Sequence, residues 1–461
     1  MAMSDRGFGE RPAGGAAGLA ERLGRGRLRR RDLLWLAGTS ASAAALASLS
    51  GCATSPVTGE TILVGMSEAQ ERSIDAQVAP HQFSQDLGEA QDTQANAYVE
   101  RVGADLARRS HRPDMPYSWR VLNANYVNAY TFPGGAMGVT RGIMTEMKSE
   151  AELAALLGHE TGHVNARHAA QRQGQAMLAQ AAVVGLGVAT SDSQWSGLVG
   201  LASQVGASAL LSSYSRDNER EADALGQEYM ARAGYPASGM TSLHQLLLAE
   251  QKSQPGMLQT MFSTHPMPAE RVETARRLAQ EKYASTARLP EQRERFMDNT
   301  ARLRALRPTI QACQKGEAED ARGKHGDAEG HYRTALKSAP RDYAANVLMA
   351  RCLVAQERPA DAKRYAELAS AIDPKEAQAI KLAGIASLGL RDYAGAFARF
   401  DAFDKRLPGD PGITFLKGVS LEGGGMRREA AAHYARYANA VRQGGASQYA
   451  VSRLKSWGYL K

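Results

Sequence analysis

The chain of 461 residues is poor in cysteine and in extended runs of basic residues. Its three cysteines, Cys52, Cys313 and Cys352, form no CxxC pair, which argues against a structural zinc site built from thiolates. Residues 1–51, with eight Arg, no Lys and four acidic residues, supply half of the formal net charge of +8. Elsewhere no basic run carries interleaved aromatic residues, so we expect no nucleic-acid partner.

Apolar runs long enough to cross a membrane are also missing after the N-terminal region. Residues 176–211 are rich in Ala, Gly, Val and Leu, but the polar residues 191–194 interrupt them. Each half is therefore shorter than the roughly 20 apolar residues that a membrane span needs. We expect a packed helical hairpin here, and a hairpin that touches a membrane is the alternative.

The N-terminus has the pattern of an export signal. Residues 25–31 read RGRLRRR, residues 33–49 are apolar and rich in Ala and Ser, and the stretch ends in Leu49-Ser50-Gly51-Cys52. A basic region, a short apolar core and small residues predict a secretory signal, with a permanent membrane anchor as the alternative. The last four residues resemble the bacterial lipobox, in which Cys52 would become the lipidated first residue and anchor the chain to a membrane.

Two further details concern the export signal. Arg30-Arg31 resembles the start of a twin-arginine signal, so the export route stays open between the two bacterial pathways. Ala53, rather than Asp, follows the cysteine, which is typical of outer-membrane lipoproteins. We therefore expect a periplasmic protein anchored to the outer membrane.

The length predicts more than one domain. We expect a signal peptide over 1–51, a metallopeptidase domain over 52–300 and helical repeats over 301–461. In the middle domain, residues 117–122 alternate as a strand does, and residues 128–142 fit two short strands around a Pro-Gly-Gly turn. Helices are expected over 149–170, with Ser149 as N-cap, over 214–250 with a break at 234–236, and over 266–283.

From residue 309 the sequence repeats every 34 residues. The in-frame residues are Pro340, Pro374 and Pro408, together with Gly316, Ala350, Gly384 and Gly418, and with Ala328, Ala362, Ala396 and Ala430. This period, with small residues at two places and Pro at the end, is the tetratricopeptide pattern. The predicted fold class is thus mainly α, an α+β catalytic domain with a small sheet followed by an α-solenoid. Cys313 and Cys352 lie in adjacent repeats, where either a disulfide or two buried thiols could form.

A metal-binding motif occupies residues 159–163, which read HETGH. Positions i and i+4 share one helix face, so His159 and His163 can present two imidazoles to one ion. Glu160 can then reach a metal-bound water and take its proton as general base. The surrounding helix is largely apolar, and buried polar side chains need partners, which a zinc ion supplies.

A catalytic zinc needs a third protein ligand. Glu219 and Asp223 are four residues apart on a predicted helix, and we expect Glu219 to bind the metal while Asp223 accepts a hydrogen bond from a ligating histidine. Glu221 is the competing ligand, but its helical phase points it away from Asp223. His265 could stabilise the oxyanion or occupy the open metal position, or simply cap a helix. His168 is about 140° out of phase with His163, so we expect a structural role.

Together these motifs resemble the HtpX and CAAX-prenyl-protease family of gluzincins over residues 54–283. The resemblance rests on the opening Pro-Val-Thr-Gly, on Asn128-Ala129 with Pro133-Gly134-Gly135, on His159 to His163 with Arg167-His168, on Ser215-Arg216 with Glu219 and Asp223, and on residues 263–266. It implies one Zn²⁺ held by His159, His163 and Glu219. It also implies substrate contacts at Asn128, Gly134 and Gly135, with the strand near 134–140 pairing with an extended substrate.

With its signal and repeats, the whole chain resembles periplasmic members of this family that act in outer-membrane quality control. The resemblance implies a zinc endopeptidase that cleaves unfolded or misassembled outer-membrane proteins and contacts the assembly machinery through its repeats. The alternative is a chaperone or assembly factor that works through its repeats, with proteolysis secondary.

Overall fold

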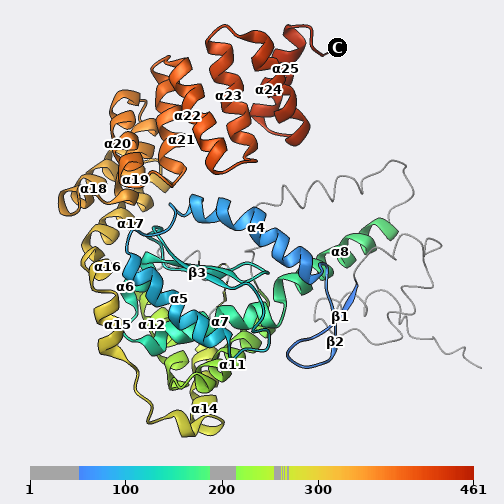
Figure 1. The fold of residues 1–461 in the computed structure, drawn as a ribbon, viewed down its shortest axis with the longest axis vertical. Coiled ribbons are helices and arrows are strands. Elements are labelled where there is room, and N and C mark those ends of the chain that lie inside the picture. Colours follow the sequence, from blue (N-terminus) through green and yellow to red (C-terminus); the bar gives the residue numbers. More distant parts are fainter. Residues whose placement is uncertain are drawn as a thin grey trace, which may run out of the picture.

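The computed structural model describes residues 51–186, 214–253, 261, 263, 265–266 and 269–460, as Figure 1 shows. A region with a small sheet comes first, and a curved stack of helix pairs leads away from it. The predicted fold class is confirmed: mainly α, with a small sheet in the first region and helical repeats after it. No helix in the described part of the chain is both long and apolar enough to cross a membrane. The hairpin predicted over 176–211 lies mostly outside these residues.

The strands in the described part of the chain form two small sheets. A hairpin pairs β1 (Cys52–Thr54) with β2 (Thr61–Leu63), with Cys52 opposite Leu63. A three-stranded sheet contains β3 (Ser118–Leu122), β4 (Ala129–Thr131) and β5 (Ala136–Thr140) in the order β3-β5-β4. The strand predicted over 117–122 and the hairpin predicted around the Pro-Gly-Gly turn are both confirmed.

The central place of β5 overturns one expectation. Because β3 pairs with β5 in parallel and β4 pairs with it antiparallel, both edges of β5 are already hydrogen-bonded. The prediction that the strand near 134–140 pairs with an extended substrate is therefore wrong. Among the strands that the structure describes, β4 is the edge on that side, and it also packs against the helix that carries the HETGH motif.

Helices surround the three-stranded sheet in the first region. Ser67 begins the first with a capping box, Asp92 caps the second, and Ser149 caps the motif helix by accepting a hydrogen bond from the backbone N–H of Glu152, as predicted. The helices are α4 (Glu68–Gln85), α5 (Thr93–Ala107), α6 (Arg141–Glu146), α7 (Glu150–Asn165), α8 (His168–Leu186), α11 (Arg216–Arg232), α12 (Ser238–Ser253), α14 (Ala269–Glu281), η1 (Ala284–Thr286), α15 (Arg293–Asn299) and α16 (Ala301–Ala305).

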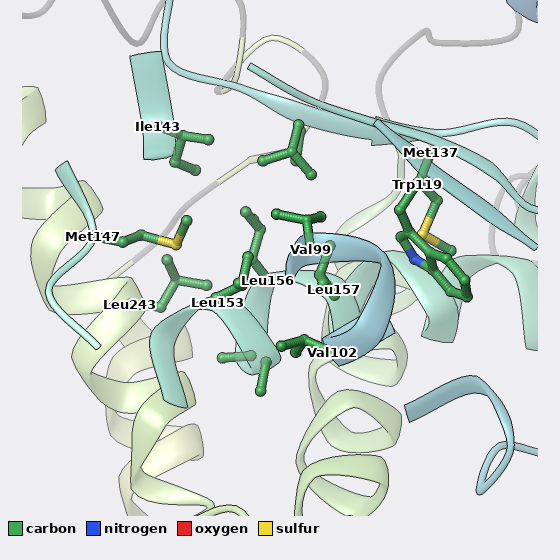
Figure 2. Packing of buried hydrophobic residues seen from close by; sticks show 14 of the residues in the cluster. Val99, Val102, Trp119, Met137, Ile143, Met147, Leu153, Leu156, Leu157 and Leu243 are labelled. Atoms are coloured by element: carbon green, nitrogen blue, oxygen red, sulfur yellow. The ribbon is translucent and has the colours of Figure 1, made fainter. Parts of the chain in front are cut away.

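The motif helix α7 lies at the centre of the main hydrophobic core. Leu153, Leu156 and Leu157 on this helix are at most 1% exposed. Figure 2 shows them among Val99 and Val102 of α5 and residues of β3, β5 and α12. Burial of such side chains stabilises the fold by about 1.5–3 kcal/mol each. The HETGH motif is thus carried by a helix packed into the core rather than by a loop.

A break after α7 corrects the single helix predicted over 149–170. The helix ends at Asn165, Arg167 takes a left-handed φ of 57°, and α8 begins at His168. The Arg167 side chain compensates for this backbone, because it donates hydrogen bonds to the Glu71 carboxylate and to the Met66 carbonyl. The break turns His168 back towards α7, which helical phase alone did not predict.

The repeats are four helix pairs and a final helix. Each pair crosses closely at the repeated small residue: a Cβ on Gly316, Gly384 or Gly418 would lie within 2.7 Å of an aromatic ring carbon of the second helix. The small residues are therefore required by this packing. The helices are α17 (Arg307–Ala321), α18 (His325–Ser338), α19 (Tyr343–Ala355), α20 (Pro359–Ile372), α21 (Gln378–Gly389), α22 (Tyr393–Arg406), α23 (Pro411–Gly423), α24 (Arg427–Ala440) and α25 (Gly445–Ser456).

A buried ion pair joins the repeats to the first region. Arg141, which begins α6 directly after β5, is 1% exposed, and its guanidinium donates two hydrogen bonds to Asp342 at 2.7 and 3.1 Å. The same guanidinium also donates to Asn125 Oδ1. Asp342 in turn caps α19 by accepting from the backbone N–H of Ala345. A second contact lies at the end of α4, where the Ser84 hydroxyl donates to the Glu376 carboxylate.

Cys313 and Cys352 are both buried free thiols, so the disulfide left open by the sequence does not form. The Cys352 thiol donates to the His325 carbonyl at 3.2 Å, and burial raises the pKa of both thiols, that of Cys352 to about 11.

Candidate metal centre

Four buried side chains converge at one point: those of His159, His163, Glu219 and His265. Each offers one ligand atom, and these atoms lie within 4.8 Å of one another. The Nε2 atoms of His159 and His163 are 3.0 Å apart, and Glu219 Oε1 lies 3.4 Å from the His163 Nε2. Imidazole nitrogens and a carboxylate oxygen at this spacing fit a divalent metal ion.

The protonation state of the group also suits a metal. Burial holds the pKa of His163 well below its usual range, so this imidazole is neutral with a free lone pair. For Glu219, burial acts to raise the pKa, but the neighbouring His265, His163 and His159 hold it well below its usual range. The site therefore presents a neutral imidazole and a carboxylate, which are the forms that bind metals.

Close backbone packing brings Glu219 to the motif. A Cβ on Gly162, inside the HETGH sequence, would lie 2.8 Å from the Ala222 carbonyl oxygen of α11, and one on Gly158 would lie 3.1 Å from that of Gly226. Larger residues at these two places would push α11 away from α7. The short contact lets the predicted third ligand on α11 reach the two histidines, whereas Glu221 is partly exposed and points elsewhere.

Each motif histidine has a partner on its far nitrogen. The Nδ1 of His159 lies 2.9 Å from Asp223 Oδ1, which leaves Nε2 for the metal, in agreement with the role expected of Asp223. The Nδ1 of His163 lies 2.8 Å from Nδ1 of His168, whose Nε2 lies 3.3 Å from Glu221. His168 is therefore a partner of a candidate ligand, and the break at Arg167 is the reason that its phase misled the sequence argument.

Glu160 and His265 lie beside the candidate ligands. Glu160 is 2% exposed, and its Oε2 has no hydrogen-bond partner among the described residues. Burial raises the pKa of its carboxyl group above the usual range. The Nδ1 of His265 is 3.1 Å from Glu219 Oε1 and 3.4 Å from His159 Nε2, and its Nε2 is 3.8 Å from Glu160 Oε1. His265 can thus act as a ligand or contact a reacting oxygen, and within the described residues its ring contacts the candidate site rather than capping a helix.

The three expected substrate residues have different surroundings. Gly134 and Ala136 donate their backbone N–H groups to the Asp75 carboxylate at 2.7 and 2.8 Å, and Gly135 has a left-handed φ of 98°. Burial raises the pKa of Asp75 to about 7. The two glycines thus form a turn that α4 holds. Asn128 lies next to the edge strand, and its Oδ1 has no partner within the described part of the chain, so its substrate contact stays a prediction.

Arg271 on α14 is a site residue that sequence reasoning missed. It is 5% exposed and donates to both oxygens of Asp223 and to Glu219 Oε2, each at 2.7 Å. It also donates to the Pro266 carbonyl, next to His265. In the sequence, the only feature that could have indicated a site role for Arg271 is its position six residues after His265. Many surface arginines on helices lie equally close to a histidine, so this feature is not specific. Arg271 neutralises two buried carboxylates, which would otherwise repel each other.

Replacing Arg271 by Met should destabilise the metal-free protein by about 2–3 kcal/mol, because two buried carboxylates lose a charged donor. The loss should be smaller in excess zinc, because a divalent cation then neutralises Glu219. Urea unfolding with a chelator and with zinc measures both values. Arg276→Met, on the same helix and paired with exposed Glu273, is the control and should cost less than about 1 kcal/mol. An equal loss with and without zinc would contradict this account.

Comparison with known proteins agrees with this geometry. Residues 93–279 match the model of peptidase family M48, and residues 321–384 match a tetratricopeptide repeat. A beta-barrel assembly-enhancing protease of Yersinia pestis is 29% identical over 226 residues, which is 47% of this chain and 46% of the relative. The mitochondrial metalloendopeptidase OMA1 of Schizosaccharomyces pombe is 32% identical over 38% of this chain and 50% of its own.

The metalloprotease YcaL of Escherichia coli K12 is 30% identical over 35% of this chain and 61% of its own. The chain thus spans about half the length of the curated relatives that it matches. The four residues that converge, His159, His163, Glu219 and His265, were all named as candidates from the sequence, and all lie within the matched range 93–279.

Proposed function

Because the chain carries a peptidase family M48 domain followed by tetratricopeptide repeats, we propose that it is a zinc-dependent endopeptidase. The observation that carries the proposal is the convergence of His159, His163 and Glu219 with Glu160 beside them. Two histidines and one glutamate are the ligand set of catalytic zinc sites that keep one position open. When bound, zinc supplies Lewis acidity and a water of lowered pKa.

The side chains of this chain then perform the proton transfers. Glu160 takes a proton from the attacking water and delivers it to the nitrogen of the leaving amine. Asp223 holds the His159 ring through Nδ1, so that Nε2 faces the metal. His265 donates towards the oxyanion that forms on the scissile carbonyl. Burial of the whole group excludes water, which strengthens each of these electrostatic contacts.

The edge strand β4 favours an extended polypeptide as substrate. The backbone N–H of Phe132 bonds to Ala136, and that of Thr140 bonds to Asn128, so these residue pairs face each other. In an antiparallel pair the hydrogen-bonded residues alternate, and the backbone groups of Ala129 and Thr131 therefore point away from β5. A substrate strand added there gains main-chain hydrogen bonds regardless of its sequence. Only an unfolded or misassembled protein offers such a strand, which supports a role in quality control.

We further propose that the protein works in the bacterial cell envelope, attached to the outer membrane through Cys52. The lipobox-like sequence before this cysteine supports the attachment, and Cys52 is exposed at the start of β1. The repeats would then contact outer-membrane assembly machinery. The name of the Yersinia relative refers to beta-barrel assembly, which agrees with this location.

The proposal predicts selective cleavage of unfolded protein. One disulfide-containing test protein, offered in its native form and in its reduced and alkylated form, should be cut at least about tenfold faster when unfolded, because only that form can pair with β4. Mass spectrometry of the products measures the rates. A chelator should abolish cleavage, and zinc should restore it. Absence of cleavage of both forms in zinc would favour the alternative of an assembly factor that acts through its repeats.

A further inference from the structure

A small cavity of about 20 Å³ lies beside the general base. Glu160 forms one part of its wall, and Met240, Leu243 and Leu247 of α12 with Met261 form an apolar part. This volume is room for about one water molecule. Two of the apolar residues are methionines, whose unbranched side chains rearrange readily, so the cavity can widen around an entering group.

The position of Glu160 indicates which substrate residue reaches this cavity. If Glu160 delivers its proton to the leaving amine, that nitrogen must lie within hydrogen-bond reach of the carboxylate. The nitrogen belongs to the residue that follows the scissile bond. Since Glu160 is also part of the cavity wall, the side chain of that same residue is close enough to reach the cavity.

His244 is a polar residue of the cavity wall that the mechanism does not use. His244 on α12 is 2% exposed, and its Nε2 lies 3.3 Å from Asp223 Oδ1, while its Nδ1 has no hydrogen-bond partner among the described residues. A carboxylate only accepts hydrogen bonds, so Nε2 carries the proton. Burial lowers the pKa of His244, so the ring is neutral and Nδ1 is an acceptor. A buried acceptor without a donor is unfavourable.

We propose that this cavity widens, by movement of its methionine side chains, into the pocket for the residue after the scissile bond, and that His244 selects there a large side chain with a hydrogen-bond donor at its tip. The apolar wall takes the body of the side chain, and Nδ1 accepts from its end. Tyrosine and tryptophan have this chemistry. The inference rests on the proposed peptidase function and names the substrate side chain that this function prefers.

The test uses peptides that are identical except for the residue after a single scissile bond, which is Tyr, Phe or Ala. The zinc-loaded full-length protein should show a kcat/KM about tenfold higher for Tyr than for Phe, the ratio expected when one buried acceptor gains or lacks its donor. Ala should be the poorest of the three, because it leaves the apolar wall unfilled. In His244→Leu the Tyr and Phe peptides should be cleaved within about twofold of each other.

His244→Asn is the matched variant, because its side-chain oxygen keeps an acceptor close to the place of Nδ1, and it should recover part of the preference for Tyr. If circular dichroism shows that His244→Leu does not fold, the preference for Tyr over Phe is compared between His244→Asn and the unmodified protein instead. Equal cleavage of Tyr and Phe by the unmodified protein, or a preference that survives in His244→Leu, would overturn the proposal. Binding of the same peptides to Glu160→Gln, with and without His244→Leu and measured by fluorescence anisotropy, separates the two proposals. A His244-dependent binding preference, together with no cleavage by the zinc-loaded protein that keeps Glu160, would leave the pocket standing and reject the peptidase function.

Discussion

Replacing Glu160 by Gln should lower the rate of peptide cleavage by about 10²–10⁴-fold while zinc stays bound, because the amide can neither take nor deliver the proton that the reaction moves. The three candidate ligands are untouched by this change. Glu160 is buried with one oxygen unpartnered, so the isosteric amide fits the same space. The measurement is kcat on an unfolded polypeptide, together with the zinc content of the purified variant.

Glu152→Gln provides the control for this result. Glu152 is a second buried glutamate of α7, two turns before the metal ligands, and it accepts a hydrogen bond from the backbone of Lys148 at the start of the helix. A general effect of removing a buried charge from α7 would appear in both variants, whereas a loss of proton transfer appears only at Glu160. Retained cleavage in Glu160→Gln with zinc bound would reject the proposed mechanism.

The second large effect is expected at the junction between the two regions. Arg141→Met should lower the free energy of unfolding by about 3–5 kcal/mol, because Asp342 is 8% exposed overall and loses its charged partner. The repeats should then unfold at a lower urea concentration than the first region, since this pair joins them. Urea titrations followed by circular dichroism and by tryptophan fluorescence measure the two transitions.

Two comparisons sharpen that experiment. Adding Asp342→Asn to Arg141→Met should recover a large part of the loss, because the neutral amide no longer leaves a buried charge and can still cap α19. Arg399→Met should cost less than about 1 kcal/mol, because its pair with Glu367 is largely solvent-exposed. A loss as small for Arg141→Met as for Arg399→Met would show that the buried pair does not hold the repeats in place.

Where local rules apply, the sequence was a good guide to this fold. The alternating residues of β3, the Pro-Gly-Gly hairpin and the N-cap at Ser149 all appear as predicted, because each depends on neighbours in the chain. The same reasoning failed at Arg167, where a left-handed residue ends α7. Helical phase assumes an unbroken helix, and the hydrogen bonds from Arg167 to Glu71 and Met66 come from a distant part of the chain.

By itself, the sequence determined the features that follow from regular spacing along the chain. The i, i+4 spacing puts His159 and His163 on one face, and the 34-residue period places a small residue wherever two repeat helices cross. Glu219, Asp223 and His265 were also expected from the sequence, whereas only the tertiary structure added Arg271 and His244. Arg271 and His244 reach the site because α11 packs against α7 through close glycine contacts. The helices α12 and α14, which carry these two residues, in turn pack against α7 and α11. That approach depends on packing between elements remote in sequence, which no local pattern records.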